Sequence, residues 1–320
     1  MTLPLIIVNP SSAGGATGAG WARAAGDVRE HFGAFNCAFT RGAGDARVIA
    51  EREARAGRRL IVACGGDGTI SEVASGILAS GADAELGVLP SGTGGDFRRT
   101  LRMPRRTRDA ARALRDGRTV RIDAGRVEFE NETGGREVRH FVNVASCGMG
   151  GEVIRRAKGA DETAPSARGA NLLGGRASYA VASAQAALSF ENPRLLVRLD
   201  GGRERHVVVT NLCVANARYF GGGMKIAPHA KLTDGLFDVV AVGDLGALSI
   251  FSNAHRLYLG THLGMSQVHH ARARKVGVRA AGGSGEKVLL EVDGELVGSL
   301  PATFEVLPAA LVVRAPAQGS

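Results

Sequence analysis

The chain has 320 residues, with 40 Lys and Arg against 31 Asp and Glu, so its formal net charge is +9. It is 44% hydrophobic, which excludes a disordered chain, and its length suits one large or two ordinary domains. The four cysteines form no CxxC pair, which argues against a zinc cluster or a disulfide scaffold. The N-terminal apolar run is too short for a signal peptide, and no stretch reaches the roughly 18–20 apolar residues that cross a bilayer. We therefore expect a soluble, cytoplasmic protein.

The first third of the chain alternates short apolar runs with helical patterns. Strands are predicted at residues 3–8, 36–40, 60–63 and 85–89, and helices at residues 21–32, 45–56, 70–80 and 107–114. Strands joined by crossover helices are typical of a parallel sheet covered by helices. We therefore predict an α/β fold in which residues 1–122 form an N-terminal open parallel-sheet (Rossmann-like) nucleotide domain.

Beyond about residue 120 the pattern changes to strands separated by Gly, Asp and Asn turns. The predicted strands are residues 126–129, 138–144, 195–199, 206–215, 237–242, 276–280, 288–292 and 303–307, with helical character at 178–188 and 245–259. This pattern predicts a C-terminal antiparallel β-sandwich domain over residues 123–307. We expect the C-terminal tail, residues 308–320, to pack back on the first domain.

Three glycine-rich loops follow three of the strands predicted in the first domain. They are residues 9–15 (NPSSAGG), 65–72 (GGDGTISE) and 90–96 (PSGTGGD). Because the carboxyl ends of parallel strands face one crevice, we expect these loops to converge. Glycines let the backbone approach a phosphate, and the helix N-termini that follow offer free N–H groups. A lone loop of this kind is more often a tight turn, but three together predict a phosphate-binding crevice.

The three loops resemble a known family. The motifs NPSSAGG, GGDGTISEV and LPSGTGGDF, in this order and spacing, are similar to the catalytic domain shared by diacylglycerol kinases, sphingosine kinases and soluble bacterial lipid kinases. The resemblance continues through FVNVASCGMGGEV, NARYFGGGMKIAPHAKLTDGLFDVV, LYLGTHLG, EVDGELVG and VLPAALVV. It implies an ATP-dependent lipid kinase that phosphorylates diacylglycerol or a similar lipid alcohol, uses Mg²⁺, and binds the lipid in the second domain. One departure is Gly95, which stands where the family usually has Asn.

The resemblance also implies the residues that contact ATP. Outside the second loop these are Asn9, Thr40 and Thr93, with Asn9 expected to order the first loop beneath the nucleotide. Within the second loop they are Gly65, Gly66, Asp67, Gly68, Thr69, Ile70 and Ser71. A lone threonine such as Thr40 or Thr93 caps a local turn about as often as it contacts a ligand, so that alternative stays open.

Phosphoryl transfer needs a base near the acceptor hydroxyl, and three carboxylates are candidates. From the residues alone, Asp293-Gly294-Glu295 favours a hairpin turn, for which Asp-Gly is a common signal. The resemblance reverses this weighting and implies Glu295 as the proton acceptor, with Asp293 holding Mg²⁺ or orienting the hydroxyl. Sphingosine kinases give the base role to the aspartate that corresponds to Asp67. Our order of preference is Glu295, Asp293, Asp67.

The segment KLTDGL, residues 231–236, resembles a loop that holds a second, structural Mg²⁺ in some relatives. The implied ligands are the main-chain carbonyls of Lys231 and Leu236 and the carboxylate of Asp234. Hard cations prefer such oxygens. An ordinary Asp-Gly turn explains the same residues equally well.

Six arginines crowd the segment after the third loop: Arg98, Arg99, Arg102, Arg105, Arg106 and Arg108. Such a cluster docks anionic lipid head groups at about 1 kcal/mol per basic residue, so we expect transient contact with a membrane surface. A solvated helix flank is the alternative. With 5% aromatic residues the chain has few stacking platforms, and we predict no nucleic-acid partner. A homodimer is left open.

Two other functions compete with the lipid kinase. An NAD kinase-like enzyme shares the GGDGT motif and a sandwich-like second domain, but the NPSSAGG and SGTxxD motifs disfavour it. A catalytically inactive nucleotide-binding regulator is conceivable because of Gly95.

Overall fold

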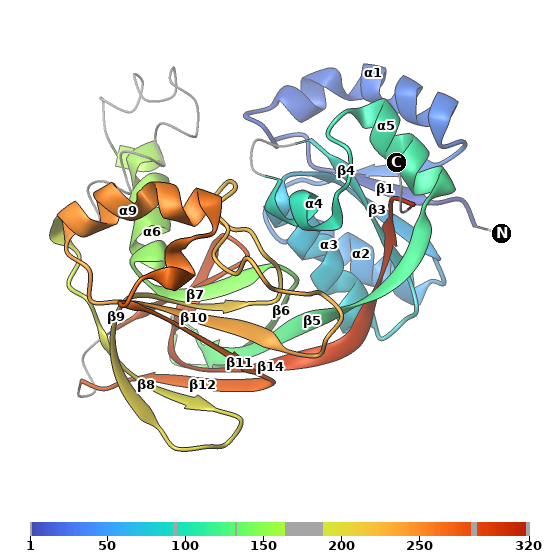
Figure 1. Ribbon diagram of the computed structural model, residues 1–320. Helices are drawn as coiled ribbons and strands as arrows, with labels where there is room; N and C mark the ends of the chain where they lie inside the picture. Colours follow the sequence, from blue (N-terminus) through green and yellow to red (C-terminus); the bar gives the residue numbers. More distant parts are fainter. Residues whose placement is uncertain (1, 92–94, 132, 164–187, 283–286, 318–320) are drawn as a thin grey trace.

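The structure is a computed structural model that describes residues 2–91, 95–131, 133–163, 188–282 and 287–317. Helices surround the strands of the N-terminal part, and the C-terminal part consists mostly of strands (Figure 1). Among the described residues, no helix is both long and apolar enough to span a membrane.

The N-terminal part is built on four parallel strands. Its elements are β1 (Leu5–Val8), α1 (Ala16–His31), β2 (Asn36–Phe39), α2 (Asp45–Arg55), β3 (Leu60–Gly65), α3 (Asp67–Ser80), β4 (Glu85–Pro90), α4 (Asp96–Leu101) and α5 (Thr107–Asp116). The strands pair in parallel in the order β2-β1-β3-β4. Helices α1 and α5 pack together on one face and α2 and α3 on the other (Figure 1). Because both faces are covered, β1 and β3 are apolar and buried along their whole length.

The C-terminal part pairs its strands antiparallel, as the sequence predicts. Its elements are β5 (Arg118–Glu130), β6 (Arg136–Phe141), β7 (Val144–Gly148), α6 (Met149–Thr163), β8 (Arg194–Leu199), β9 (Arg205–Ala215), β10 (Phe237–Gly243), α9 (Ala247–Leu259), the 3₁₀ helix η2 (His262–Gly264), β11 (Val268–Ala273), β12 (Lys275–Ala280), β13 (Leu289–Val292) and β14 (Glu295–Ala315). Aromatic rings fill the core, where Phe141 stacks on Phe237 at 5.6 Å between ring centroids and meets the edge of Phe304.

Strand β14 joins the two parts. It has 21 residues, pairs antiparallel with β5, β12 and β13, and then runs parallel to β4, where Val312 lies opposite Glu85. Figure 1 shows β5 and β14 running side by side from one part into the other. The prediction of a separate open parallel sheet is therefore not confirmed, because β14 pairs with β4 and continues the ladder into a 14-stranded sheet.

Several elements differ from those predicted. The strand expected at residues 138–144 is two strands, β6 and β7, and the break at residues 142–143 donates backbone N–H groups to a buried carboxylate. Helices α4 and α6 were not predicted, and α4 depends on a cap that lies far away in the sequence. Of the helix predicted at 178–188, residues 178–187 lie outside the described residues.

Candidate active site

The three glycine-rich loops are hydrogen-bonded to one another. The side-chain amide of Asn9 donates to Thr69 Oγ1 at 3.0 Å, which links the first loop to the second. The backbone N–H of Ser91 donates to the carbonyl of Gly65 at 3.0 Å, which links the third loop to the second. The loops that follow β1, β3 and β4 therefore converge at the carboxyl ends of these strands, as the sequence predicts.

Gly65 lies where no side chain fits. A Cβ placed on it would stand 2.4 Å from Thr69 Oγ1 and 3.0 Å from Ser12 Oγ. Helix α3 begins two residues later, and its first backbone hydrogen bond runs from Ile70 to the carbonyl of Gly66. The N–H groups of residues 67–69 precede that bond and carry the positive end of the helix dipole, an arrangement that favours an anion.

Of the two threonines predicted outside the second loop, one falls in the described part of the chain. Thr40 directly follows β2, where its N–H donates to the carbonyl of Val8 at 2.9 Å, and it is buried. This places Thr40 at the same edge of the sheet as the three loops. Thr93 lies outside the described residues.

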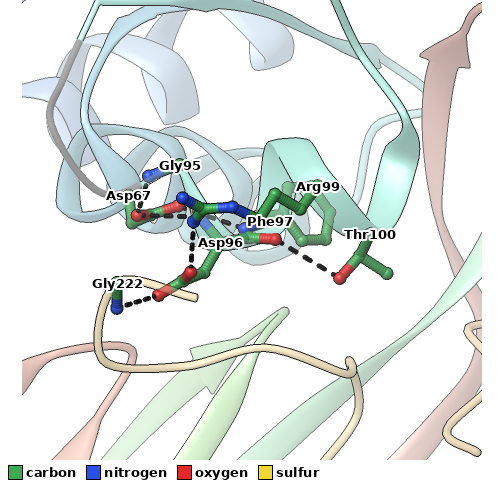
Figure 2. A network of polar contacts seen from close by, with 7 residues as sticks. All are labelled: Asp67, Gly95, Asp96, Phe97, Arg99, Thr100 and Gly222. Carbon is green, nitrogen blue, oxygen red and sulfur yellow. Dashed lines mark hydrogen bonds and ion pairs between the residues drawn. The ribbon is translucent and has the colours of Figure 1, made fainter. Parts of the chain in front are cut away.

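Asp67, the first residue of α3, caps the distant helix α4 with its side chain (Figure 2). Its Oδ2 accepts the N–H groups of Gly95 at 2.7 Å and Asp96 at 3.1 Å, and its Oδ1 accepts that of Phe97 at 3.1 Å. Gly95 has a φ of 72°, in the left-handed region that suits glycine. Since its backbone supplies the contact to Asp67, this contact survives the replacement of the family's Asn.

Asp96 links α4 to the C-terminal part (Figure 2). Its Oδ2 accepts the N–H of Gly222 at 2.8 Å, and Arg99 Nη1 lies 2.7 Å from its Oδ1. Burial raises the pKa of the Asp96 carboxyl above its usual range, and the N–H of Gly222 opposes that shift. The turn around Gly222 and the helix capped by Asp67 are thus held together through one carboxylate.

Asp293 occupies a cage of donors in the break between β6 and β7. The N–H groups of Val142, Asn143 and Val144 donate to its carboxylate at 3.0, 3.0 and 3.1 Å. The hydroxyl of Ser71, in the second glycine-rich loop, donates to the same carboxylate. Burial nevertheless raises the pKa of Asp293 to about 6, because desolvation outweighs these donors. Asp293 therefore ties the acidic turn, residues 293–295, to helix α3.

Glu295, which belongs to the C-terminal part, lies close to the start of α3 in the N-terminal part. It is the half-buried first residue of β14. A Cβ placed on Gly68 would lie 3.6 Å from Glu295 Oε1. The acidic turn of the C-terminal part and the glycine loop of the N-terminal part consequently form one site.

In the predicted structural metal loop, residues 231–236, the carboxylate of Asp234 already has partners within the protein. The guanidinium of Arg272 contacts Asp234 Oδ2, and the N–H of Leu236 donates to Asp234 Oδ1 at 3.3 Å. No cluster of three or more His, Cys, Asp or Glu side chains suited to a metal occurs among the described residues. The donor set of Lys231, Asp234 and Leu236 suits a hard cation, but the cation has to displace Arg272 from the carboxylate.

The arginine cluster is only partly available to a membrane. Arg98 Nη1 donates to the carbonyl of Met103 at 2.9 Å, and Arg99 pairs with Asp96. Four of the arginines are exposed: Arg102, Arg105, Arg106 and Arg108.

Sequence reasoning missed two buried carboxylates beside the predicted residues. Asp123 accepts the N–H groups of Gly235 at 2.7 Å and Ala309 at 2.8 Å, and so fixes the turn that contains Asp234. Glu291 lies in the apolar run KVLLEV, where an isolated acid two residues before Asp293 was the available signal.

Glu291 is held between the acidic turn and strand β7. It accepts a hydrogen bond from the Ser146 hydroxyl at 2.7 Å and another from the N–H of Gly294. Burial raises the pKa of Glu291 to about 7, and the nearby charge of Asp293 raises it further. Glu291 thus supports the turn that carries Glu295.

The raised pKa of Glu291 predicts a pH-dependent stability. Between about pH 4.5 and pH 7 the folded protein keeps a proton on Glu291 that the unfolded chain has lost. This contribution to the free energy of unfolding is complete below pH 4.5 and disappears as the pH rises through 7, a loss of about 3 kcal/mol. Urea unfolding at a series of pH values should show the slope for the wild type and a flatter curve for Glu291→Gln. An unchanged slope in that variant contradicts the assignment.

Comparisons with known proteins show the family to which the chain is related. The family described as the diacylglycerol kinase catalytic domain matches residues 4–127, and the YegS C-terminal NAD kinase beta sandwich-like domain matches residues 155–315. The diacylglycerol kinase of Mycobacterium tuberculosis is 32% identical over 279 residues, covering 86% of this chain and 82% of that protein. That of Bacillus subtilis is 30% identical over 263 residues, covering 82% and 79%.

The fold also matches a solved structure. A crystal structure described as a diacylglycerol kinase from Bacillus anthracis superposes with a TM-score of 0.69 at 20% identity, covering 98% of this chain and 96% of that one. This likeness shows a shared fold, and the relatives above carry the sequence relationship. The chain therefore belongs to the diacylglycerol kinase family of lipid kinases.

Proposed function

We propose that this protein is an ATP-dependent lipid kinase that transfers the γ-phosphoryl group of ATP to the hydroxyl of diacylglycerol or a similar lipid alcohol. The observation that carries the proposal is the approach of Glu295 to Gly68 at the start of α3. A carboxylate there stands beside a helix N-terminus that suits a phosphate group. The relatives from Mycobacterium tuberculosis and Bacillus subtilis are both named diacylglycerol kinase, which supports the same reaction.

The nucleotide lies, in this proposal, at the carboxyl ends of the parallel strands. Residues 65–71 cradle the phosphates, Asn9 supports them through Thr69, and Thr40 and Thr93 flank the nucleotide. We assign residues 1–122 and the tail 308–320 to a Rossmann-like ATP-binding domain, and residues 123–307 to the domain that binds the lipid.

Glu295 acts as the general base. Its carboxylate accepts the proton of the lipid hydroxyl while the hydroxyl oxygen attacks the γ-phosphorus, and the bond from that phosphorus to the β–γ bridging oxygen breaks to release ADP. Asp293 is a weaker candidate because three N–H groups and the Ser71 hydroxyl already occupy its oxygens. Asp67 is weaker still because its oxygens cap α4. Both hold the site in shape.

Mg²⁺ bound with ATP supplies charge neutralisation of the transferred phosphoryl group. We also propose a structural Mg²⁺ held by the carbonyls of Lys231 and Leu236 and by Asp234. Titration with Mn²⁺ followed by electron paramagnetic resonance tests this second site without ATP. Asp234→Asn should remove one bound ion, and an unchanged stoichiometry contradicts the proposal.

The reaction is tested with labelled ATP against several acceptors. Diacylglycerol, a sphingoid base, ceramide and an isoprenoid alcohol are offered in mixed micelles, with NAD offered in solution. We expect a labelled lipid phosphate and no labelled NADP. Labelled NADP supports the NAD kinase-like alternative, whereas ATP binding without any labelled product supports the inactive regulator.

Membrane contact through the four exposed arginines is a separate proposal. It predicts that the protein sediments with vesicles containing anionic lipid and is released as salt rises, because Lys and Arg interact with such surfaces electrostatically. Sedimentation that is insensitive to anionic lipid and to salt contradicts it.

A further inference from the structure

A pocket opens between the strands of the C-terminal part. It has a volume of about 660 Å³, in the range typical of small-molecule sites. Its lining residues come from β8, β9, β10 and β11 and from the turn between β8 and β9. Its interior is lined by the apolar side chains of Val197, Leu199, Val207, Leu212, Val239 and Ala241.

The pocket arises because β9 pairs with different partners along its length. Its first residues pair with β8, where Arg205 lies opposite Val197. Its later residues pair with β10, where Leu212 lies opposite Ala241. Since β8 and β10 are not paired with each other, an apolar space opens between them where β9 passes from one partner to the other.

The rim of this pocket is positively charged. This charge comes from the two lining arginines, because His270 is hydrogen-bonded to the carboxylate of Asp238, and no acidic side chain lines the pocket in the described part of the chain. Among the described residues, Arg203 and Arg205 have no ion pair, because Glu204 between them is taken by Arg198 and Arg279. The apolar interior suits a hydrocarbon chain, and the two unpaired guanidinium groups suit an anion at its end.

The pocket is distinct from the proposed catalytic site. Cross-strand partners share one face of a sheet, and the pairing places Val239, Val214, Ala145 and Val292 in one row. Glu295 is the partner of Val292 on β14 and ends this row, so four strand spacings of about 4.8 Å each separate it from Val239 in the pocket. In Figure 1 the hairpin of β8 and β9 lies at the far end of the C-terminal part from helix α3.

We propose that this pocket binds a single-chain anionic amphiphile, of which a fatty acid is the simplest member. The acyl chain lies over the apolar side chains of Leu212 and Ala241, which are cross-strand neighbours, and the carboxylate meets Arg203 and Arg205. This site goes beyond the proposed kinase reaction, and its occupancy is measured without ATP or phosphoryl transfer.

The test is displacement of a fluorescent fatty acid from the full chain, at concentrations below micelle formation. Oleate should displace the probe at least tenfold more strongly than oleyl alcohol, which lacks the charge. The double variant Arg203→Gln, Arg205→Gln should weaken oleate binding at least tenfold, because charge-assisted hydrogen bonds are lost. Ala241→Leu, which keeps every charge but fills the pocket, should weaken both the probe and oleate.

Two control variants separate this pocket from other binding modes. Arg279→Gln removes an arginine that already pairs with Glu204, and Glu295→Gln alters the proposed catalytic site. Both should bind oleate like the wild type. The proposal is overturned if the probe does not bind, if oleyl alcohol competes as well as oleate, or if Arg279→Gln weakens binding as much as the double variant. Binding only to vesicles of anionic phospholipid also overturns it and indicates a membrane contact instead.

Discussion

Replacing Glu295 by glutamine is expected to lower kcat for lipid phosphorylation by about 10²-fold or more, because an amide cannot accept the proton of the lipid hydroxyl. The substitution keeps the size of a half-buried side chain at the first position of β14, so the fold should persist. Since the proposed nucleotide site is formed by the glycine-rich loops, KM for ATP should change little. The measurement is the rate of labelled lipid phosphate formation at saturating ATP.

A matched control lies on the same strand. Glu305→Gln alters an exposed glutamate ten residues further along β14 and should leave kcat unchanged. Asp67→Asn completes the series and should act through the loss of the α4 cap rather than of a base. If Glu295→Gln keeps more than a tenth of the wild-type rate, Glu295 is not the base.

Replacing Asp293 by asparagine is expected to lower the free energy of unfolding by about 3 kcal/mol. Three buried N–H groups donate to its carboxylate, and each buried donor left without an acceptor costs about 1–3 kcal/mol. The asparagine keeps one carbonyl oxygen but turns its NH₂ group toward other donors. Because Glu295 follows two residues later, kcat should fall as well, and urea unfolding separates the two effects.

Asp200 offers a control because its backbone has nearly the same φ angle as that of Asp293. Its φ is 48°, against 49° for Asp293, and both precede a glycine. Its Oδ1 accepts the N–H groups of Arg274 and Lys275 at 2.8 Å, but in an exposed turn. Asp200→Asn should cost about 0.5 kcal/mol or less, because water replaces the lost acceptor. Equal losses in both variants mean that burial is not the source of the effect at Asp293.

The sequence predicts those parts of the site whose residues form a contiguous motif. Each glycine-rich loop directly follows its strand, and the turn from Asp293 to Glu295 is contiguous, so motifs sufficed to find them. The approach of Glu295 to Gly68 is a contact between distant segments. Composition and periodicity carry no information about such a contact, and only the family resemblance anticipated it.

The missed features depend on partners far apart in the sequence. Helix α4 has no side-chain cap of its own, since Asp67, at the start of α3, accepts its first N–H groups. The continuity of β14 was missed because Pro308 lies within it, and proline normally ends strand pairing. The register shifts between Leu307 and Leu311, and the side chain of Asp123 accepts the N–H of Ala309 in that gap. The strand therefore continues past a residue that usually interrupts it.

The continuity of β14 restricts how this enzyme opens for its substrates. The strand that begins with Glu295 ends beside β4, so the proposed base and the strands that carry the glycine-rich loops belong to one hydrogen-bonded ladder. A hinge made of a free linker is not available along this path. We expect lipid entry to bend the ladder at residues 308–310, where pairing is already interrupted, and the two halves to unfold together instead of behaving as interchangeable modules.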